Sequence, residues 1–222
     1  MSPLNFAAFA GFLAAWIGYT FYADSAARTR SLMGAASRHR ALWMEAMLAR
    51  DNRIVDSTVV ATLARSVLFF AQTSIFIIAG LLATFGAVDR IGALLAEVPI
   101  ASPGTSRELH IKLALLIGVF IYSFFKFTWS MRLFNYLSVL VGAAPAHDAP
   151  RNGGRDAAID RAARLGDLAV DHFNRGIRGY YFGLAVLSWF LDPWLFMAAT
   201  LWVVAVLWRR EFRSDTLSAM SQ

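Results

Sequence analysis

Hydrophobic residues along the chain fall into four long runs, and charged residues gather between them. The runs cover residues 4–23, 67–88, 111–135 and 180–208. A helix of about 20 apolar residues crosses the roughly 30 Å hydrocarbon core of a bilayer, and each run reaches that length. No stretch shows the alternation of period two that a half-buried strand requires. The pattern therefore predicts an all-α, polytopic membrane protein with about four transmembrane helices, forming a single integral-membrane domain.

The two long connections, residues 24–66 and 144–179, carry helical patterns of their own. In residues 157–173, apolar side chains recur on one helical face and charged side chains on the other. Large apolar residues around Trp43 and Met47 predict a further helix that lies along the membrane surface. We therefore expect cytoplasmic amphipathic helices in addition to the spans.

Positive charge predicts the orientation of the spans. Both long connections are rich in arginine, whereas residues 89–110 contain only Arg90 and Arg107. Cytoplasmic connections retain Lys and Arg, so the two long connections are expected in the cytoplasm and the N-terminus outside. This orientation predicts a multi-pass protein of the cell inner membrane.

The fourth run is interrupted at Asp192-Pro193. Aspartate followed by proline is typical of a helix start, with Asp as the N-cap and Pro in the first turn. The run is therefore either one span kinked at this point or a re-entrant hairpin that returns the C-terminus to the cytoplasm. We favour the kinked span, although it places Arg209, Arg210 and Arg213 outside, against the charge rule.

Composition narrows the classes of function. Apolar residues make up 58% of the 222 residues and charged residues 16%, and the net charge is +6. The basic residues stand beside the spans and not on a soluble face, so nucleic-acid binding is not expected. The absence of cysteine excludes disulfides, thiolate metal sites and cysteine nucleophiles.

Three stretches together resemble a known family. They cover residues 56–81, 110–145 and 174–182, and their most distinctive segments are FFAQT at 69–73, FFKFTW at 124–129 and NRGIRGYYF at 174–182. In these segments the chain resembles domain-of-unknown-function family 599, an integral-membrane family with bacterial and plant members. The resemblance covers nearly the whole chain and implies a multi-span topology, but no reaction, ligand or cofactor. The family often has glycine before the proline of the fourth run, where this chain has Asp192.

Lys126 is the leading candidate for an intramembrane polar site, because a charge at bilayer depth is costly and usually has a function. If Lys112 marks the outer interface, Lys126 lies about 21 Å deeper and can reach the inner headgroups by snorkelling. Alternatively, Lys126 lines a polar cavity together with Tyr122 and Ser130 on the same helical stripe. Asp192 is a candidate counter-ion for Lys126, although its depth and its role as an N-cap argue against a direct pair. Trp129, three residues from Lys126, could instead offer its indole face to the ammonium.

Arginines beside the inner headgroups are candidate contacts for anionic lipid, the partner that the charge pattern predicts. They are Arg28, Arg38, Arg40, Arg132, Arg175 and Arg178. His39, Asp51, Asp56 and His172 do not have the spacing of a metal site, so we predict no metal and no cofactor.

Small residues follow one stripe of the first run, where Gly11, Ala14 and Gly18 are candidate helix-packing positions. This stripe favours a non-catalytic subunit or scaffold that packs with other membrane proteins or with itself as a homo-oligomer. A small oligomeric transporter or channel that uses Lys126 and Asp192 is the alternative. An enzyme that acts on lipid at the cytoplasmic interface is a second alternative. No catalytic residues are predicted.

Overall fold

Long helices make up nearly all of the structure. The computed structural model describes residues 2–99, 101, 104–150 and 153–220, without the side chains of residues 26–29. Within this part of the chain the ordered elements are all helical, and they are α1 (Pro3–Arg30), α2 (Leu32–Ala49), α3 (Ile54–Phe85), α4 (Val88–Ala96), α5 (Ser106–Gly142), α6 (Gly153–Trp189), α7 (Pro193–Phe212) and α8 (Asp215–Met220). The all-helical fold predicted from the sequence is confirmed for these residues.

Local sequence explains where several helices begin. Ser2 precedes α1, and its side chain accepts a hydrogen bond from the Asn5 amide, while Pro3 occupies the first turn. Thr105 and Glu108 form a capping box at the start of α5, in which each side chain accepts from the other residue's backbone amide at 3.3 Å. These bonds engage amides that the first turn of a helix leaves without partners.

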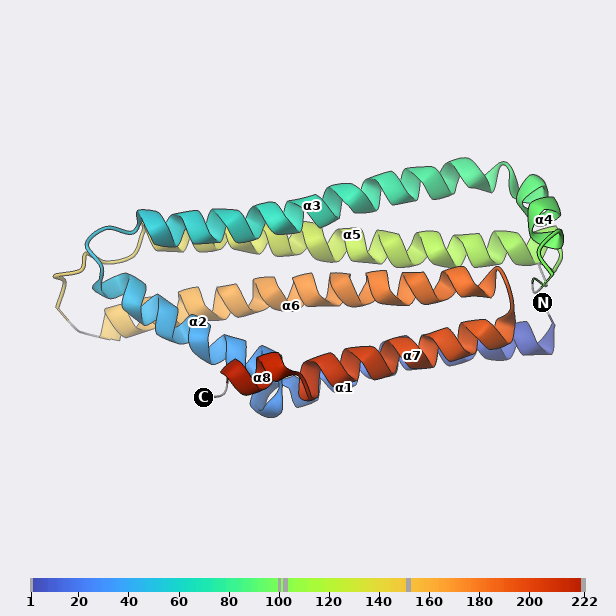
Figure 1. Cartoon of the computed structure of the whole chain (residues 1–222). Coiled ribbons are helices and arrows are strands. Elements are labelled where there is room, and N and C mark those ends of the chain that lie inside the picture. Colours follow the sequence, from blue (N-terminus) through green and yellow to red (C-terminus); the bar gives the residue numbers. More distant parts are fainter. Residues whose placement is uncertain (1, 100, 102–103, 151–152, 221–222) are drawn as a thin grey trace.

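The long helices lie side by side in a bundle (Figure 1). Helix α5 packs between α3 and α6. Helix α7 packs on one half of α6, with α1 packed against α7, and α2 packs on the other half of α6. We call the half flanked by α2 the α2 half. The end that holds the N-terminus, α4 and the α6–α7 turn is the hairpin end.

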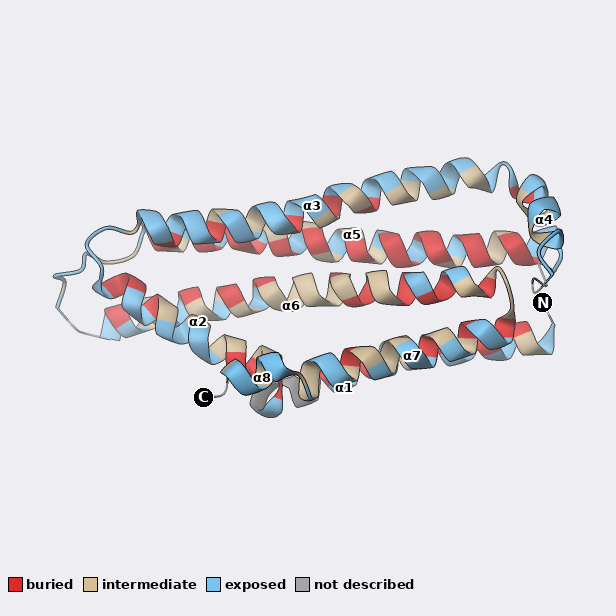
Figure 2. Cartoon of the chain, viewed as in Figure 1, coloured by how far each residue is buried: buried red, intermediate tan, exposed pale blue. Residues whose placement is uncertain are grey.

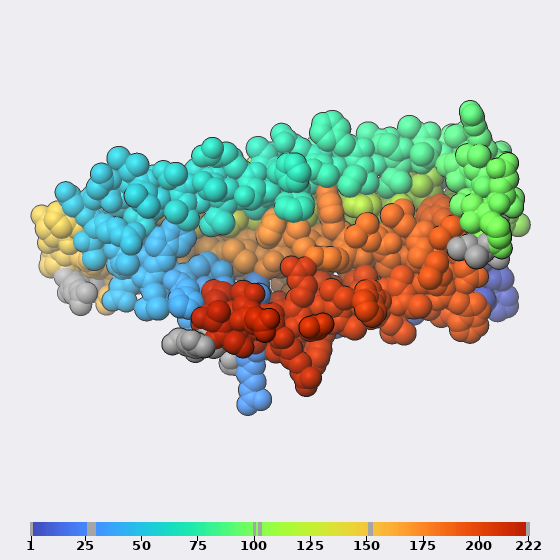
Figure 3. Space-filling model, viewed as in Figure 1, coloured from blue at the N-terminus to red at the C-terminus, as the bar shows by residue number. Residues whose placement is uncertain are grey.

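Two apolar cores fill the two halves of the bundle. The core beside the hairpin end includes Phe12, Phe120, Phe182 and Phe196, from α1, α5, α6 and α7. The core of the α2 half includes Met44, Val60, Phe127 and Leu137, from α2, α3 and α5. Figure 3 shows side chains of α6 filling the space between α3 on one edge and α7 and α8 on the other.

Glycines in α6 bring it close to α5. A Cβ atom at Gly176 would lie 2.5 Å from the Phe127 ring, and one at Gly179 would overlap the Ser123 hydroxyl. Small residues allow such close approach between helices in a membrane, where packing takes over from the hydrophobic effect. The tightest helix pair of the bundle therefore depends on a small-residue stripe in α6.

Within the described ranges, three helices are long and apolar enough to cross a membrane, at Pro3–Ser25, Ile54–Phe85 and Ser106–Gly142. Their outward faces carry large apolar side chains such as Phe21 and Phe76, which are 73% and 76% exposed. Figure 2 shows the exposed positions along the outer face of α3, opposite the buried face of α5. These faces have the character expected of a surface in contact with lipid.

The break at Asp192-Pro193 is present, but the prediction of one kinked span is wrong. Helix α6 ends at Trp189, and α7 begins at Pro193 and runs back antiparallel to α6 (Figure 1). The Asp192 side chain accepts hydrogen bonds from the amides of Trp194 at 2.7 Å and Leu195 at 3.2 Å. Asp192 therefore starts a new helix in a new direction, so α6 and α7 form a helical hairpin in place of one kinked helix.

Helix α6 also joins two segments that the sequence pattern had separated. Residues 157–173 and the first part of the fourth run belong to one continuous helix, Gly153–Trp189. The glycines at 176 and 179 do not interrupt it, because they pack against α5 inside the bundle.

Candidate functional site: an arginine-lined cleft at the α1–α2 junction

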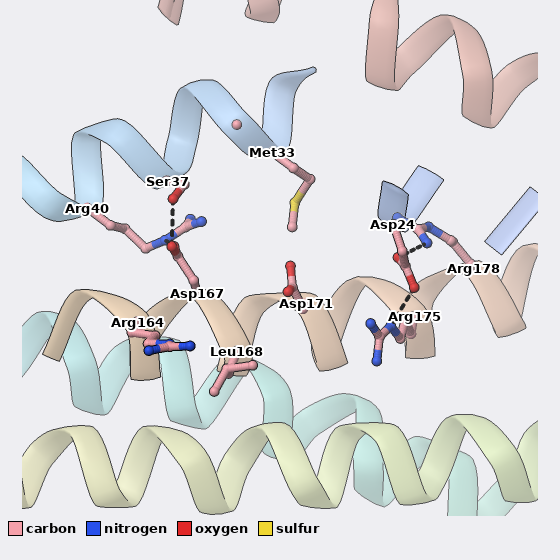
Figure 4. Close-up of a pocket in the computed structure, with 11 residues that line it drawn as sticks. Asp24, Met33, Ser37, Arg40, Arg164, Asp167, Leu168, Asp171, Arg175 and Arg178 are labelled. Atoms are coloured by element: carbon pink, nitrogen blue, oxygen red, sulfur yellow. Dashed lines mark hydrogen bonds and ion pairs between the residues drawn. The ribbon is translucent and has the colours of Figure 1, made fainter. Parts of the chain in front are cut away.

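A polar cleft of about 450 Å³ lies where α1 ends and α2 begins, against α6 (Figure 4). Its charged lining consists of four arginines and three aspartates, namely Arg40, Arg164, Arg175, Arg178, Asp24, Asp167 and Asp171. Asp24 lies within the last turn of the Pro3–Ser25 span, so the cleft is located at the end of that span.

Asp24 holds two of the arginines. Its Oδ2 atom accepts from Arg175 Nε at 2.9 Å, and its Oδ1 atom accepts from Arg178 NH1 at 2.9 Å (Figure 4). Arg178 is 7% exposed, and its guanidinium also lies over the Tyr19 ring, 5.8 Å from the centroid. The single acid near the end of α1 therefore ties that helix to two successive turns of α6.

Asp167 makes the equivalent link between α6 and α2. Its Oδ1 atom accepts from Arg40 Nε at 2.6 Å, and its Oδ2 atom accepts from the Ser37 hydroxyl at 2.6 Å. Each of these three ion pairs orients its arginine and engages one guanidinium N–H group. The other N–H groups of Arg40, Arg175 and Arg178 have no protein partner among the described residues.

Arg164 differs from the other arginines of the cleft. It is exposed, and no ion pair or hydrogen bond links its side chain to any other described residue. Arg164 therefore contributes a positive charge to the cleft and forms none of the described bonds that hold the helices together.

The predicted intramembrane pair of Lys126 and Asp192 does not form. Asp192 caps α7 at the hairpin end, and no ion pair joins its carboxylate to Lys126 within the described part of the chain. The hairpin accounts for this separation, because it places the α6–α7 turn at the far end of α5 from Lys126.

The remaining residues of that predicted site have packing roles. Lys126 Nζ lies 5.2 Å from the centroid of the Tyr122 ring, and Arg132 is the cation that lies over Trp129. Tyr122 packs edge-on against Trp16. The Ser130 hydroxyl donates to the Ala169 carbonyl at 2.6 Å and so links α5 to α6.

The candidate lipid-contact arginines are divided by the structure. Arg40, Arg175 and Arg178 line the cleft. Arg38 is exposed on α2, and Arg132 donates to the Tyr136 hydroxyl on α5 at 2.9 Å. The side chain of Arg28 lies outside the described residues.

The candidate packing residues of α1 face outward. Gly11, Ala14 and Gly18 are exposed, and a Cβ atom at Gly11 or Gly18 would have no described neighbour within 4 Å. The stripe is therefore not used in contacts within the described part of the chain.

A second polar cluster, at the hairpin end, was not identified from the sequence. Lys112 is 1% exposed and Glu108 is 9% exposed. Glu108 Oε1 accepts from the Ser2 amide at 3.0 Å and from Asn5 Nδ2 at 3.4 Å. Trp189 Nε1 donates to Asn5 Oδ1 at 2.8 Å, and Lys112 Nζ lies 5.7 Å from the centroid of the Trp189 ring. The spacing of Thr105 and Glu108, a capping box, was the sequence signal that could have located this cluster.

No group of three described His, Asp or Glu side chains converges in a way that could hold a metal ion. Asp56, one of the acids considered above, is instead buried and accepts from Trp43 Nε1 at 2.7 Å and from Arg50 NH1 at 2.5 Å.

A family model described as protein of unknown function, DUF599, matches residues 7–216. The chain belongs to the DUF599 family. The match spans nearly all of α1 to α7, so the resemblance seen in the three sequence stretches is confirmed. Neither the curated proteins nor the solved structures contain a match to this DUF599 chain.

Proposed function

We propose that this DUF599 protein crosses the cell inner membrane five times, with the N-terminus outside and the C-terminus in the cytoplasm. The five segments are α1, the parts of α3, α5 and α6 nearest the hairpin end, and α7. The α2 half, with the remainder of α3, α5 and α6, then extends into the cytoplasm.

The position of the C-terminal arginines supports this topology. Phe212 at the end of α7 packs against Tyr22 near the end of α1, and Glu211 accepts from the Met33 amide at 3.2 Å. Arg209, Arg210 and Arg213 are therefore at the same end of the spans as the arginine-rich connections. The conflict with the positive-inside rule that a four-span arrangement creates does not arise with five crossings.

Cysteine labelling of intact cells tests the topology, because the chain has no cysteine of its own. Ala96→Cys on α4 and Ser218→Cys on α8 both place the thiol at exposed positions. We expect a membrane-impermeant maleimide to label Ala96→Cys in intact cells, and Ser218→Cys only after permeabilisation. Labelling of Ser218→Cys in intact cells would restore the four-span arrangement.

We further propose that the protein is a non-catalytic packing subunit of a membrane assembly, with α1 as its contact helix. The observation that carries this proposal is the exposed stripe of Gly11, Ala14 and Gly18, which no described side chain covers. A stripe of small residues lets a second helix approach closely, and van der Waals contact then stabilises the pair.

The transporter alternative has less support. Lys126 and Asp192, the residues that it requires, lie near opposite ends of the spans. The apolar core that contains Phe12, Phe120 and Phe182 fills the bundle between them. A polar path between the two charges would have to pass through this core.

Gly11→Leu tests the packing proposal, and Gly80→Leu is its matched control. Gly80 is also an exposed glycine of a membrane-spanning helix, where an added Cβ atom would meet no described neighbour within 4 Å, but it lies on α3. We expect Gly11→Leu to raise the dissociation constant of the assembly about tenfold or more, with normal folded yield, because the added side chain separates the helices. Native mass measurement in lipid nanodiscs follows the assembly. A wild-type protein that is monomeric and has no co-purifying partner would refute the proposal.

A further inference from the structure

The cleft at the α1–α2 junction offers hydrogen-bond donors, while the carboxylates of Asp24 and Asp167 already accept hydrogen bonds from the protein. Both oxygens of Asp24 accept from Arg175 and Arg178, and both oxygens of Asp167 accept from Arg40 and Ser37. A guanidinium carries five N–H donors, and these ion pairs use one on each arginine. The cleft therefore suits a ligand that accepts hydrogen bonds.

The charges that line the cleft also favour an anion, and they indicate how many negative charges it carries. Four arginines face three aspartates across the cleft, which leaves one positive charge without a matching negative charge. Arg164 is the arginine that has no described acidic partner. A ligand with a single negative charge would balance the cleft.

Arginine also favours one chemical class of anion. The planar guanidinium fork matches two oxygens of a phosphate group, and the ion pairs to Asp24 and Asp167 hold three of these forks in place. In Figure 4, Arg40 extends from α2 and Arg175 and Arg178 extend from α6, with the Asp24 side chain of α1 between the last two. The cleft volume of about 450 Å³ lies within the range of roughly 300–1,000 Å³ that is usual for small-molecule sites.

The position of the cleft favours a lipid headgroup over free phosphate as the source of the phosphate group. Asp24 lies at the end of the Pro3–Ser25 span, where the headgroups of a bilayer begin. Met33 and Leu168 add apolar surface to a lining that is otherwise mostly charged, and Leu168 is 44% exposed. This combination fits a headgroup with its first glycerol carbons better than it fits a free ion.

We propose that the cleft binds the phosphodiester group of one membrane phospholipid, a monoanion that the arginines of the cleft, including Arg164, attract. This site goes beyond the packing role proposed for α1, because it lies on a different face and its test does not depend on the oligomeric state.

Lipid titration of the full-length protein in detergent, followed by native mass spectrometry, tests the site. The ligands are phosphatidylglycerol, which has a monoanionic phosphodiester, diacylglycerol, which has none, and inorganic phosphate. We expect one phosphatidylglycerol to bind per chain with saturation, diacylglycerol not to bind, and inorganic phosphate to displace the lipid only at a large excess. Phosphate that binds as tightly as the lipid would overturn the lipid source, and equal binding of diacylglycerol would overturn the role of the phosphodiester.

Arg164→Gln and Arg161→Gln form the matched pair of variants. Both residues are exposed on α6 within one turn of each other, but only Arg164 lines the cleft. We expect Arg164→Gln to weaken phosphatidylglycerol binding about tenfold, which corresponds to the loss of one charge-assisted hydrogen bond. Arg161→Gln should change it less than about twofold, because an exposed charge outside the cleft contributes only screened attraction.

Folding of Arg164→Gln is checked by circular dichroism and size-exclusion elution, and both should match wild type because the side chain has no described bond to lose. Arg164→Lys provides a second measurement, since it keeps the charge and removes the fork. Equal weakening by Arg161→Gln and Arg164→Gln would show general attraction of the basic surface for anionic lipid, and it would overturn the site.

Discussion

Acidic and basic side chains form one cluster at the start of α1 and another at its end, and the two clusters differ in their access to solvent. At the hairpin end, Lys112 and Glu108 are 1% and 9% exposed beneath Trp189 and the N-terminal turn of α1. At the α1–α2 junction, the side chains of Asp24 and Arg175 are 30% and 29% exposed and border an open cleft. Similar residue types therefore occupy a closed environment at one end and an accessible one at the other.

The difference in access decides what each cluster can do. A buried charge is stabilised mainly by its protein partners, and Glu108 uses its carboxylate to link α5 to the N-terminal turn of α1. The arginines at the junction retain unused N–H groups beside a cavity, so they can bind a further anion. The first cluster is expected to determine stability and the second to determine binding.

Glu108→Ala is the prediction with the largest expected effect on this comparison. The change removes the cap of α5, two acceptor contacts to the N-terminal turn and the acid nearest to the buried Lys112 charge. We expect it to lower the free energy of unfolding by about 3 kcal/mol, since breaking a buried charge cluster by removing one partner is strongly destabilising. Unfolding in detergent, followed by circular dichroism, measures the change.

Lys112→Met is the control from the same cluster. Lys112 Nζ has no hydrogen-bond partner among the described residues, so Met keeps the length of the side chain and removes a poorly compensated charge. We expect a change within about 1 kcal/mol of wild type, or a gain in stability. A loss as large as that of Glu108→Ala would contradict the view that Glu108 is the organising residue of the closed cluster.

Much of the fold could be predicted from the sequence, because span length and capping are local properties. The apolar runs locate the parts of α1, α3 and α5 that are long and apolar enough to cross a membrane, and Asp192-Pro193 locates the start of α7. The direction of α7 could not be predicted, because an N-cap fixes where a helix begins and not how it packs. The C-terminal arginines are the sequence signal for a reversal, because a single kinked span places them outside, against the charge rule.

The candidate site was less predictable, since it depends on contacts between distant residues. Arg40, Arg175 and Arg178 were identified as candidates from their position beside the spans, but their aspartate partners were not. Asp24 and Asp167 lie more than 120 residues from the arginines that they bind in the other helix, a separation that no spacing rule can reveal. The small-residue stripe of α1 was noticed, whereas the glycines of α6 that pack against α5 were not, because they lie in a segment rich in charge.

Asp192→Ala tests the hairpin end with a smaller expected effect. Loss of the cap bonds to the amides of Trp194 and Leu195 should lower the free energy of unfolding by about 1 kcal/mol. Asp192→Asn keeps an oxygen acceptor in the same place and should cost much less, because Asn is as good an N-cap as Asp. Thermal unfolding curves of the two variants make the comparison. If Asp192→Asn were as destabilising as Asp192→Ala, the carboxylate charge would matter, and an ion-pair role would replace the capping role.

The smallest expected effect concerns His172, which lies on α6 beside the cleft region. Its ring packs against Trp129, and its Nδ1 atom has no hydrogen-bond partner among the described residues. Burial, followed by the positive charges of Lys126 and Arg175, lowers the pKa of His172 from 6.5 to about 4, while Asp24 acts in the opposite direction. The folded protein therefore keeps this imidazole neutral, whereas the unfolded chain takes up a proton near pH 6.5.

Because the unfolded state binds more protons between about pH 6.5 and pH 4, stability should fall as the pH is lowered through that window. The loss between pH 7 and pH 6 is expected to be roughly a few tenths of a kcal/mol after allowance for partial exposure of the ring. His172→Gln has no titrating group at this position and should flatten the pH dependence of the unfolding midpoint over the same range. His39→Gln is the control, since His39 is an exposed histidine on α2. An unchanged pH dependence in His172→Gln would mean that water or an anion from the cleft reaches the His172 imidazole. The solvent-accessible region around the cleft would then extend past α6 to Trp129.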